Sequence, residues 1–119
     1  MITDAKYVAE RDRRVALLDK LMVDTRVDAL VLTSTAQQAY QIATKYVSGY
    51  QLTTRRDFVF MKPGEMPRLI IPTVGQQSHA RRLSWLPDEN IYCGPMVETV
   101  CGWIRELGLT KPRVGMYAT

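Results

Sequence analysis

The segment from Val27 to Thr73 constrains the fold of this chain more than any other part. It opens with a continuous apolar run, Ala29–Leu32, which is typical of a strand covered on both faces. Two further apolar runs, Arg56–Met61 and Arg68–Ile71, are joined by Lys62–Glu65, in which proline precedes glycine. Proline presets the negative φ of a type II turn and glycine tolerates its positive φ. The segment therefore predicts a sheet that contains an antiparallel hairpin.

The spacing of apolar residues predicts four helices in this chain. The first helix starts near Thr3 or Asp4, and the second covers roughly Ala36 to Tyr46. The third covers about Gln76 to Trp85, and the fourth runs from Gly94-Pro95 to a stop at Gly108. Further short strands are expected at Ile91–Cys93 and from Arg113 to Thr119. The buried stripe of the first helix should consist of Val8, Val15, Leu18, Leu21 and Met22. The expected fold is α/β, with a mixed sheet of about five strands and helices packed on both faces.

Length and composition indicate a single soluble domain over residues 1–119. Hydrophobic residues make up 46% of the chain and charged residues 24%, which is the range of globular proteins. No apolar run approaches the ~20 residues that span a bilayer, and the amino terminus has no secretory-signal pattern. We therefore expect a cytoplasmic protein without a membrane partner.

The basic residues leave a second class of function open. The net charge is +4, and arginines are mixed with aromatic residues over Tyr46–Phe60, as in some proteins that bind RNA or single strands. Phe58 and Phe60 are better explained as core residues of a strand, and the charges are spread along the chain. Tyr50, Arg55 and Arg56 are the best candidates for contact with another molecule, because they lie between a helix end and a strand start. A stand-alone basic module that binds nucleic acid is the alternative.

No set of residues able to run a reaction is evident. The single histidine, His79, falls on an expected surface helix, and the sequence lacks a glycine-rich phosphate loop after the first strand. A small enzyme would need Asp57, Glu98 and His79 to converge in one pocket. The two cysteines, Cys93 and Cys101, fit no metal or redox spacing and are expected to be small apolar side chains, with Cys101 on the inner face of the last helix. We expect no catalytic residue and no metal ligand in this chain.

An ordered series of segments resembles the N-terminal domain of the creatinase/prolidase/aminopeptidase-P (Xaa-Pro peptidase) family. Each segment is short, and the order in which they follow one another carries the resemblance over essentially the whole chain. The segments are Arg13-Arg14-x-x-x-Leu18, Asp28-Ala-Leu-Val-Leu-Thr-Ser34, Tyr46-Val-Ser-Gly-Tyr50, the hairpin from Arg56 to Thr73, and Glu106-Leu-Gly-Leu109 leading into Arg113-Val-Gly115.

The resemblance implies a three-layer domain of ribonuclease-H-like shape that precedes a larger "pita-bread" catalytic domain, absent from this chain. In the family that second domain holds two divalent metal ions such as manganese and cleaves bonds next to proline, whereas creatinase hydrolyses creatine without metal. The N-terminal domain builds dimer contacts and lends residues to the rim of a neighbouring active site. The resemblance places such rim residues at Tyr50, Arg55 and Arg56. The implied partners are the C-terminal catalytic domain of the same parent chain and a second subunit, with no cofactor in this chain.

Overall fold

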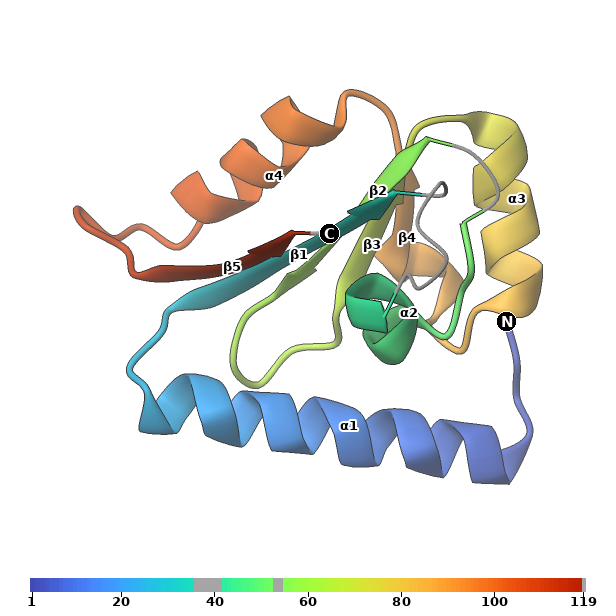
Figure 1. The fold of residues 1–119 in the computed structure, drawn as a ribbon, viewed down its shortest axis with the longest axis horizontal. Helices are drawn as coiled ribbons and strands as arrows, with labels where there is room; N and C mark the ends of the chain where they lie inside the picture. Colours follow the sequence, from blue (N-terminus) through green and yellow to red (C-terminus); the bar gives the residue numbers. More distant parts are fainter. Residues whose placement is uncertain (36–41, 53–54, 119) are drawn as a thin grey trace.

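The computed structural model describes residues 1–35, 42–52 and 55–118, which form a five-stranded sheet with helices packed around it (Figure 1). The helices are α1 (Ala5–Asp24), α2 (Ile42–Ser48), α3 (Val74–Leu83), the short 3₁₀ helix η1 (Asp88–Asn90) and α4 (Met96–Arg105). The strands are β1 (Ala29–Thr35), β2 (Arg56–Met61), β3 (Arg68–Ile71), β4 (Ile91–Cys93) and β5 (Val114–Ala118). Apart from η1, the elements follow the predicted order.

The strands lie in the order β4-β3-β2-β1-β5, so the sheet is mixed. The central strand β2 runs antiparallel to β1 and β3, whereas β5 is parallel to β1 and β4 is parallel to β3. The predicted hairpin is therefore confirmed. Its turn is of the expected kind, because Gly64 has a φ of +83° and the Glu65 N–H donates to the Lys62 carbonyl at 3.3 Å.

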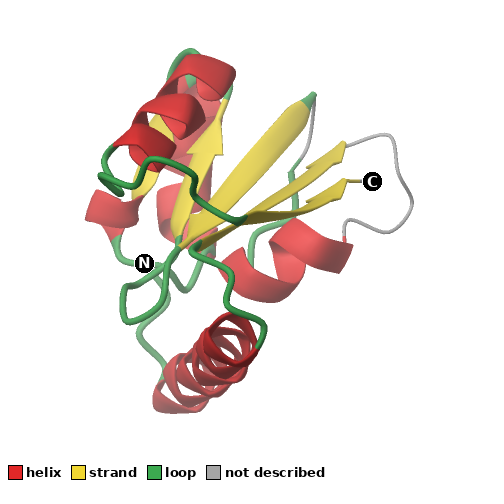
Figure 2. Cartoon of the chain, turned by 90° about the vertical axis from the view of Figure 1, so that its left-hand side faces the viewer, coloured by secondary structure: helices red, strands yellow, loops and turns green. Residues whose placement is uncertain are grey.

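Helices cover both faces of the sheet, as predicted. α1, α2 and α3 pack on one face and α4 packs on the other; Figure 1 shows α1 and α4 on opposite sides, and Figure 2 shows the same layers from the left-hand side of that view. The larger core, on the α1–α3 face, includes Met22, Leu32, Val47, Val59, Leu69, Trp85 and Leu86. The smaller core, beneath α4, includes Val31, Phe60, Ile70, Val100 and Trp103. Phe58 packs against this second core, so both phenylalanines of β2 point inward as predicted.

The predicted buried stripe of the first helix is confirmed except at Leu21: Met22 is buried, Val15 and Leu18 pack against the larger core, and Val8 is half-buried. Asp4 caps this helix by accepting from the Lys6 N–H at 3.0 Å. Leu21, predicted to be buried, is 54% exposed, and Arg11 is only 7% exposed. Arg11 thus joins Met22 on the buried side of the helix, about three helical turns away. The aliphatic stem of an arginine can extend an apolar face while its guanidinium finds a polar partner.

Several predicted boundaries were displaced. Of the helix predicted over 36–46, residues 36–41 lie outside the described residues, and α2 runs two positions further, to Ser48. The third helix ends at Leu83, before the predicted Trp85, because Ser84 is extended (ψ 153°) and turns the tryptophan into the core. The fourth helix begins at Met96, after Gly94-Pro95, and the predicted stop at Gly108 has the left-handed φ of +69°.

None of the helices that the structure describes is long and apolar enough to cross a lipid bilayer.

Candidate functional site

The segment Tyr46–Tyr50 lies at the end of α2 and is fixed by the segment that follows α3. The Trp85 indole N–H donates to the Val47 carbonyl at 2.7 Å, and the Ser84 hydroxyl donates to the Ser48 carbonyl at 2.5 Å. Between these contacts Gly49 adopts a left-handed φ of +68° directly against the Trp85 ring. These hydrogen bonds satisfy carbonyl groups that a helix end otherwise leaves unpaired. The segment is therefore held in one conformation.

Arg14 completes this cluster from α1. Its guanidinium carbon lies 4.4 Å from the centroid of the Tyr46 ring and 4.9 Å from that of Trp85. One of its nitrogens donates to the Tyr46 carbonyl at 2.9 Å, and another donates to Glu10 at 3.0 Å. A planar guanidinium suits this position because it can stack and donate hydrogen bonds at the same time. Two of the segments that carry the family resemblance thus meet in one contact network.

Tyr50, the first predicted rim residue, is buried, with 1% of its surface exposed. Its hydroxyl lies 2.9 Å from Nδ1 of His79 on α3, and the two rings meet edge to face at 5.6 Å. Burial, followed by the charge of Asp57, raises the pKa of Tyr50. His79, expected on a surface helix, is half-buried. The Tyr50 side chain therefore joins the loop to α3 inside the domain.

Arg55 and Arg56, the other two predicted rim residues, have different environments. Arg56, at the start of β2, is half-buried and donates from Nη1 to the Thr33 hydroxyl of β1 at 3.0 Å. Arg55 is exposed and has a positive φ of 65°, which is uncommon for a residue with a side chain. Of the three residues, Arg55 is the one presented to solvent. Their contact with a substrate stays a prediction.

Asp57 is a buried carboxyl group, which the sequence analysis considered only as a member of a pocket with Glu98 and His79. It is fully buried (0% exposed) in β2, on the same face as Val59 and Met61. Burial raises its pKa to about 7, against the opposing effects of the Thr44 hydroxyl, backbone N–H groups and the Arg56 charge. The burial of Asp57 could have been predicted from the alternation of side chains along a strand. Because β2 is covered on both faces, every second residue, including Asp57, enters the α1–α3 core.

The carboxylates and the histidine do not converge into a reactive centre. Glu98 is exposed on α4, across the sheet from Asp57 and from the Tyr50–His79 pair. Within the described ranges, no group of three or more histidine, cysteine, aspartate or glutamate side chains could hold a metal ion. Cys93 and Cys101 are free thiols. The enzyme alternative that required Asp57, Glu98 and His79 in one pocket is therefore contradicted.

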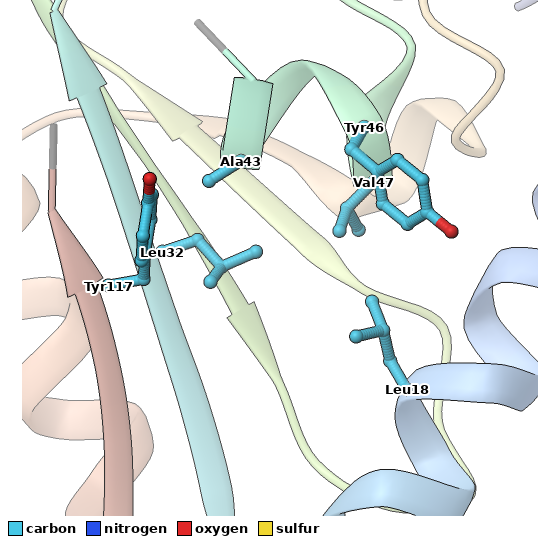
Figure 3. A pocket seen from close by; sticks show the side chains of 6 residues that line it. All are labelled: Leu18, Leu32, Ala43, Tyr46, Val47 and Tyr117. Atoms are coloured by element: carbon cyan, nitrogen blue, oxygen red, sulfur yellow. The ribbon is translucent and has the colours of Figure 1, made fainter.

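Strand β5 is an edge of the sheet and has an apolar hollow beside it on each face. Figure 3 shows the hollow on the α1–α3 face, of about 250 Å³, lined by Leu18, Leu32, Ala43, Tyr46, Val47 and Tyr117. The hollow beneath α4, of about 470 Å³, is lined by Val31, Phe58, Val97, Val100, Cys101, Ile104, Val114 and Met116. Met116 and Tyr117 of β5 remain 68% and 51% exposed. This edge of the described sheet therefore exposes large apolar side chains to solvent.

Solved structures with the same fold are Xaa-Pro peptidases and a related domain. The Xaa-Pro dipeptidase from Bacillus anthracis matches 89% of this chain with a TM-score of 0.66 and 15% identity, and the chain spans 26% of that protein. The prolidase from Pyrococcus furiosus matches 87% of this chain with a TM-score of 0.58 and 15% identity, and the chain spans 27% of that protein. A creatinase/prolidase-like N-terminal domain from Corynebacterium diphtheriae matches 93% of the chain and is spanned over 98% of its own length, with a TM-score of 0.54 and 12% identity. No protein-family model and no curated protein matches the chain.

These matches confirm the resemblance at the level of the fold. The chain has the α/β fold of the creatinase/prolidase-like N-terminal domain, and it spans about a quarter of the two peptidases. In those peptidases a larger part of the polypeptide lies outside the matched region. The ribonuclease-H-like description and the roles of individual side chains stay predictions.

Proposed function

We propose that this chain is the non-catalytic N-terminal domain of a larger hydrolase, of the Xaa-Pro peptidase type (proline dipeptidase or aminopeptidase P) or the creatinase type. The observation that carries the proposal is the fold shared with the Xaa-Pro dipeptidase from Bacillus anthracis over 89% of the chain. The network of Arg14 with Tyr46–Tyr50 supports it, because segments that suggested the family from sequence also form one structural unit.

In this proposal the domain makes dimer contacts and contributes to the rim of an active site built elsewhere. Arg55 is the residue best placed for the rim, because its side chain is exposed beside the fixed Tyr46–Tyr50 segment. The described residues do not suit a centre of two divalent metal ions, so such ions would be held by the catalytic domain alone. The proposal also places the parent protein in the cytoplasm as a homo-oligomer.

An activity assay on the isolated chain tests the first half of the proposal. The purified chain is incubated with Xaa-Pro dipeptides in the presence of Mn²⁺ or Co²⁺, and free proline is measured. No turnover above the buffer control is expected, because no described residues form a hydrolytic centre. Turnover that a chelator abolishes would refute the assignment. Sequencing the gene beyond codon 119 should reveal a reading frame with the aspartate, histidine and glutamate ligands of a catalytic domain.

The rim role is tested in that longer enzyme by changing Arg55 to alanine. If Arg55 contacts the substrate, KM for an Xaa-Pro dipeptide should rise several-fold with little change in kcat, because a binding contact is lost. Arg82→Ala is the matched control, since Arg82 is an exposed arginine near the end of α3. Equal KM values for the two variants would contradict the rim role and leave the domain assignment intact.

No observation favours the nucleic-acid alternative. The basic loop on which this alternative rests contains Arg55 and Arg56, and Arg56 is engaged with the Thr33 hydroxyl. Arginines elsewhere that could extend a binding face are also engaged within the protein. Arg13 and Arg14 pair with Glu10, Arg68 pairs with Glu65, and Arg81 donates to the Ile91 carbonyl. A basic footprint for nucleic acid needs cations that are free to meet phosphates on one face.

A further inference from the structure

Three buried side chains near the Arg56 end of the β1–β2 ladder have polar atoms that nothing in the described part of the chain satisfies. Both carboxylate oxygens of Asp57, the hydroxyl of Ser34 and the hydroxyl of Thr44 lack a hydrogen-bond partner among the described residues. Each of the three residues is 0% exposed. Unsatisfied groups of this kind are rare, because each one costs the free energy of removing it from water.

The three side chains come from three elements and lie together. Ser34 of β1 is paired directly with Asp57 of β2, so their side chains are neighbours on the α1–α3 face of the sheet. Thr44 lies on α2, which packs on both strands, and its hydroxyl is close enough to Asp57 to influence the carboxyl group. The unsatisfied atoms thus form one cluster rather than three separate defects.

The three side chains present oxygen atoms only, and they carry one negative charge when Asp57 is ionised. The Thr44 hydroxyl and the backbone N–H groups of Ser34 and Asp57 also act on this carboxylate. Four oxygens without nitrogen or sulfur suit a hard cation or an ammonium ion. The neighbouring cation, Arg56, does not fill this role, because its guanidinium donates to Thr33, a residue of the opposite strand face. The charge of a buried carboxylate requires a partner within the protein.

We propose that Ser34, Thr44 and Asp57 bind a small monovalent cation, Na⁺, K⁺ or NH₄⁺, through their side-chain oxygens. One positive charge neutralises the single carboxylate, whereas a divalent ion would leave a net charge in a buried position. All three residues are fully buried, so the ligand has to be small. This inference concerns the integrity of the domain and is independent of the proposed peptidase role.

Thermal unfolding in different chloride salts tests the proposal. The melting temperature of the purified chain is measured at pH 8 in NaCl, KCl, NH₄Cl and tetramethylammonium chloride at equal ionic strength. A cation that binds only the folded state should raise Tm by roughly 3–6 °C in at least one of the small-cation salts relative to tetramethylammonium chloride. The ranking of the three small cations identifies the preferred ion.

Variants separate a specific site from a general salt effect. Asp57→Asn should abolish the difference between the salts, and Thr44→Val, which keeps the shape of the side chain, should reduce it. Glu98→Gln removes an exposed carboxylate on the other face and should preserve the difference. If Asp57→Asn does not fold, the Tm difference between the salts measured for Thr44→Val decides whether the site is specific. Equal Tm values for the wild type in all four salts, as expected if only water solvates the cluster, would overturn the proposal.

Discussion

Gly49 occupies a position where both the backbone and the surroundings exclude a side chain. Its φ is +68°, and a Cβ atom placed there would lie 2.8 Å from Cδ2 of Trp85. Gly108 has nearly the same φ, +69°, but no atom lies within 4 Å of its Cβ position. The pair therefore separates the cost of a left-handed backbone from the cost of steric overlap.

Replacing Gly49 with alanine should destabilise the domain by roughly 2–5 kcal/mol, since left-handed strain and overpacking against a buried ring act together. Gly108→Ala should cost only about 1–2 kcal/mol, the backbone component alone. Chemical denaturation of the two variants gives both values. Equal losses would show that the Trp85 ring moves aside, and would contradict the rigid packing described for the Tyr46–Tyr50 segment.

Asp57 should make the stability of the domain depend on pH. Its pKa is about 7 in the folded protein against 3.8 for an ordinary aspartate, so the folded state binds the proton more tightly than the unfolded state. The stabilisation is fully present below about pH 3.8 and is lost as the pH rises through 7, a change of about 4 kcal/mol at most. Asp57→Asn should remove this pH-dependent stabilisation. The free energy of unfolding of the wild type and the variant is measured by urea denaturation as a function of pH in tetramethylammonium buffers, and the difference between the two gives the contribution of Asp57. If the unfolding free energies of the wild type and Asp57→Asn vary with pH in the same way, the raised pKa of Asp57 is contradicted.

At the scale of elements, Arg14 joins α1 to the end of α2. It stacks on Tyr46 and Trp85 and donates to the Tyr46 carbonyl. Arg14→Lys keeps the charge but loses the planar stack and the forked donors, so a loss of about 1–2 kcal/mol in unfolding free energy is expected. Arg13→Lys is the control: Arg13 also pairs with Glu10 but is exposed, and its loss should stay within about 0.5 kcal/mol. Similar losses for both variants would assign the effect to Glu10 and not to the aromatic contacts.

Local signals were sufficient to predict most elements. The hairpin of β2 and β3 follows from two apolar runs around a proline-glycine turn, and the stop at Gly108 follows from the left-handed preference of glycine. The end of α3 was misplaced because Trp85 satisfies helical spacing equally well. Its departure from the helix is decided by the distant Val47 carbonyl, which accepts its indole hydrogen bond.

The candidate site was predicted less well, for a related reason. A charged residue on a helix is ordinarily assigned to solvent, so the burial of Arg11 and the stacking of Arg14 were not foreseen. Tyr50 was placed correctly between a helix end and a strand start, but the position of its hydroxyl depends on His79, 29 residues away. Contacts between distant segments have no local signature in a single sequence. Strand parity would have revealed Asp57 once both faces of β2 were assigned to the core.

At the scale of the whole molecule, the open edge at β5 should govern self-association. The strand carries no charged residue and no proline between Val114 and Ala118, so it lacks the usual protection of an edge strand. Light scattering coupled to size exclusion should show association that increases with concentration, and Met116→Lys should reduce it. Leu83→Lys, which changes a 47%-exposed leucine on α3, should have no such effect. A wild-type chain that stays monomeric at all concentrations would contradict this expectation.

The pairing of β1 with β5 also has a consequence for biosynthesis. β1 occupies an interior position in the sheet, yet β5, one of its two neighbours, lies far along the chain: the contact between Asp28 and Arg113 spans 85 positions. On the ribosome, β1 can pair with β2 early, but its other side waits until Val114–Ala118 has emerged from the exit tunnel. The nascent domain therefore presents an incomplete sheet through most of its translation, and this interval is when a chaperone would bind it.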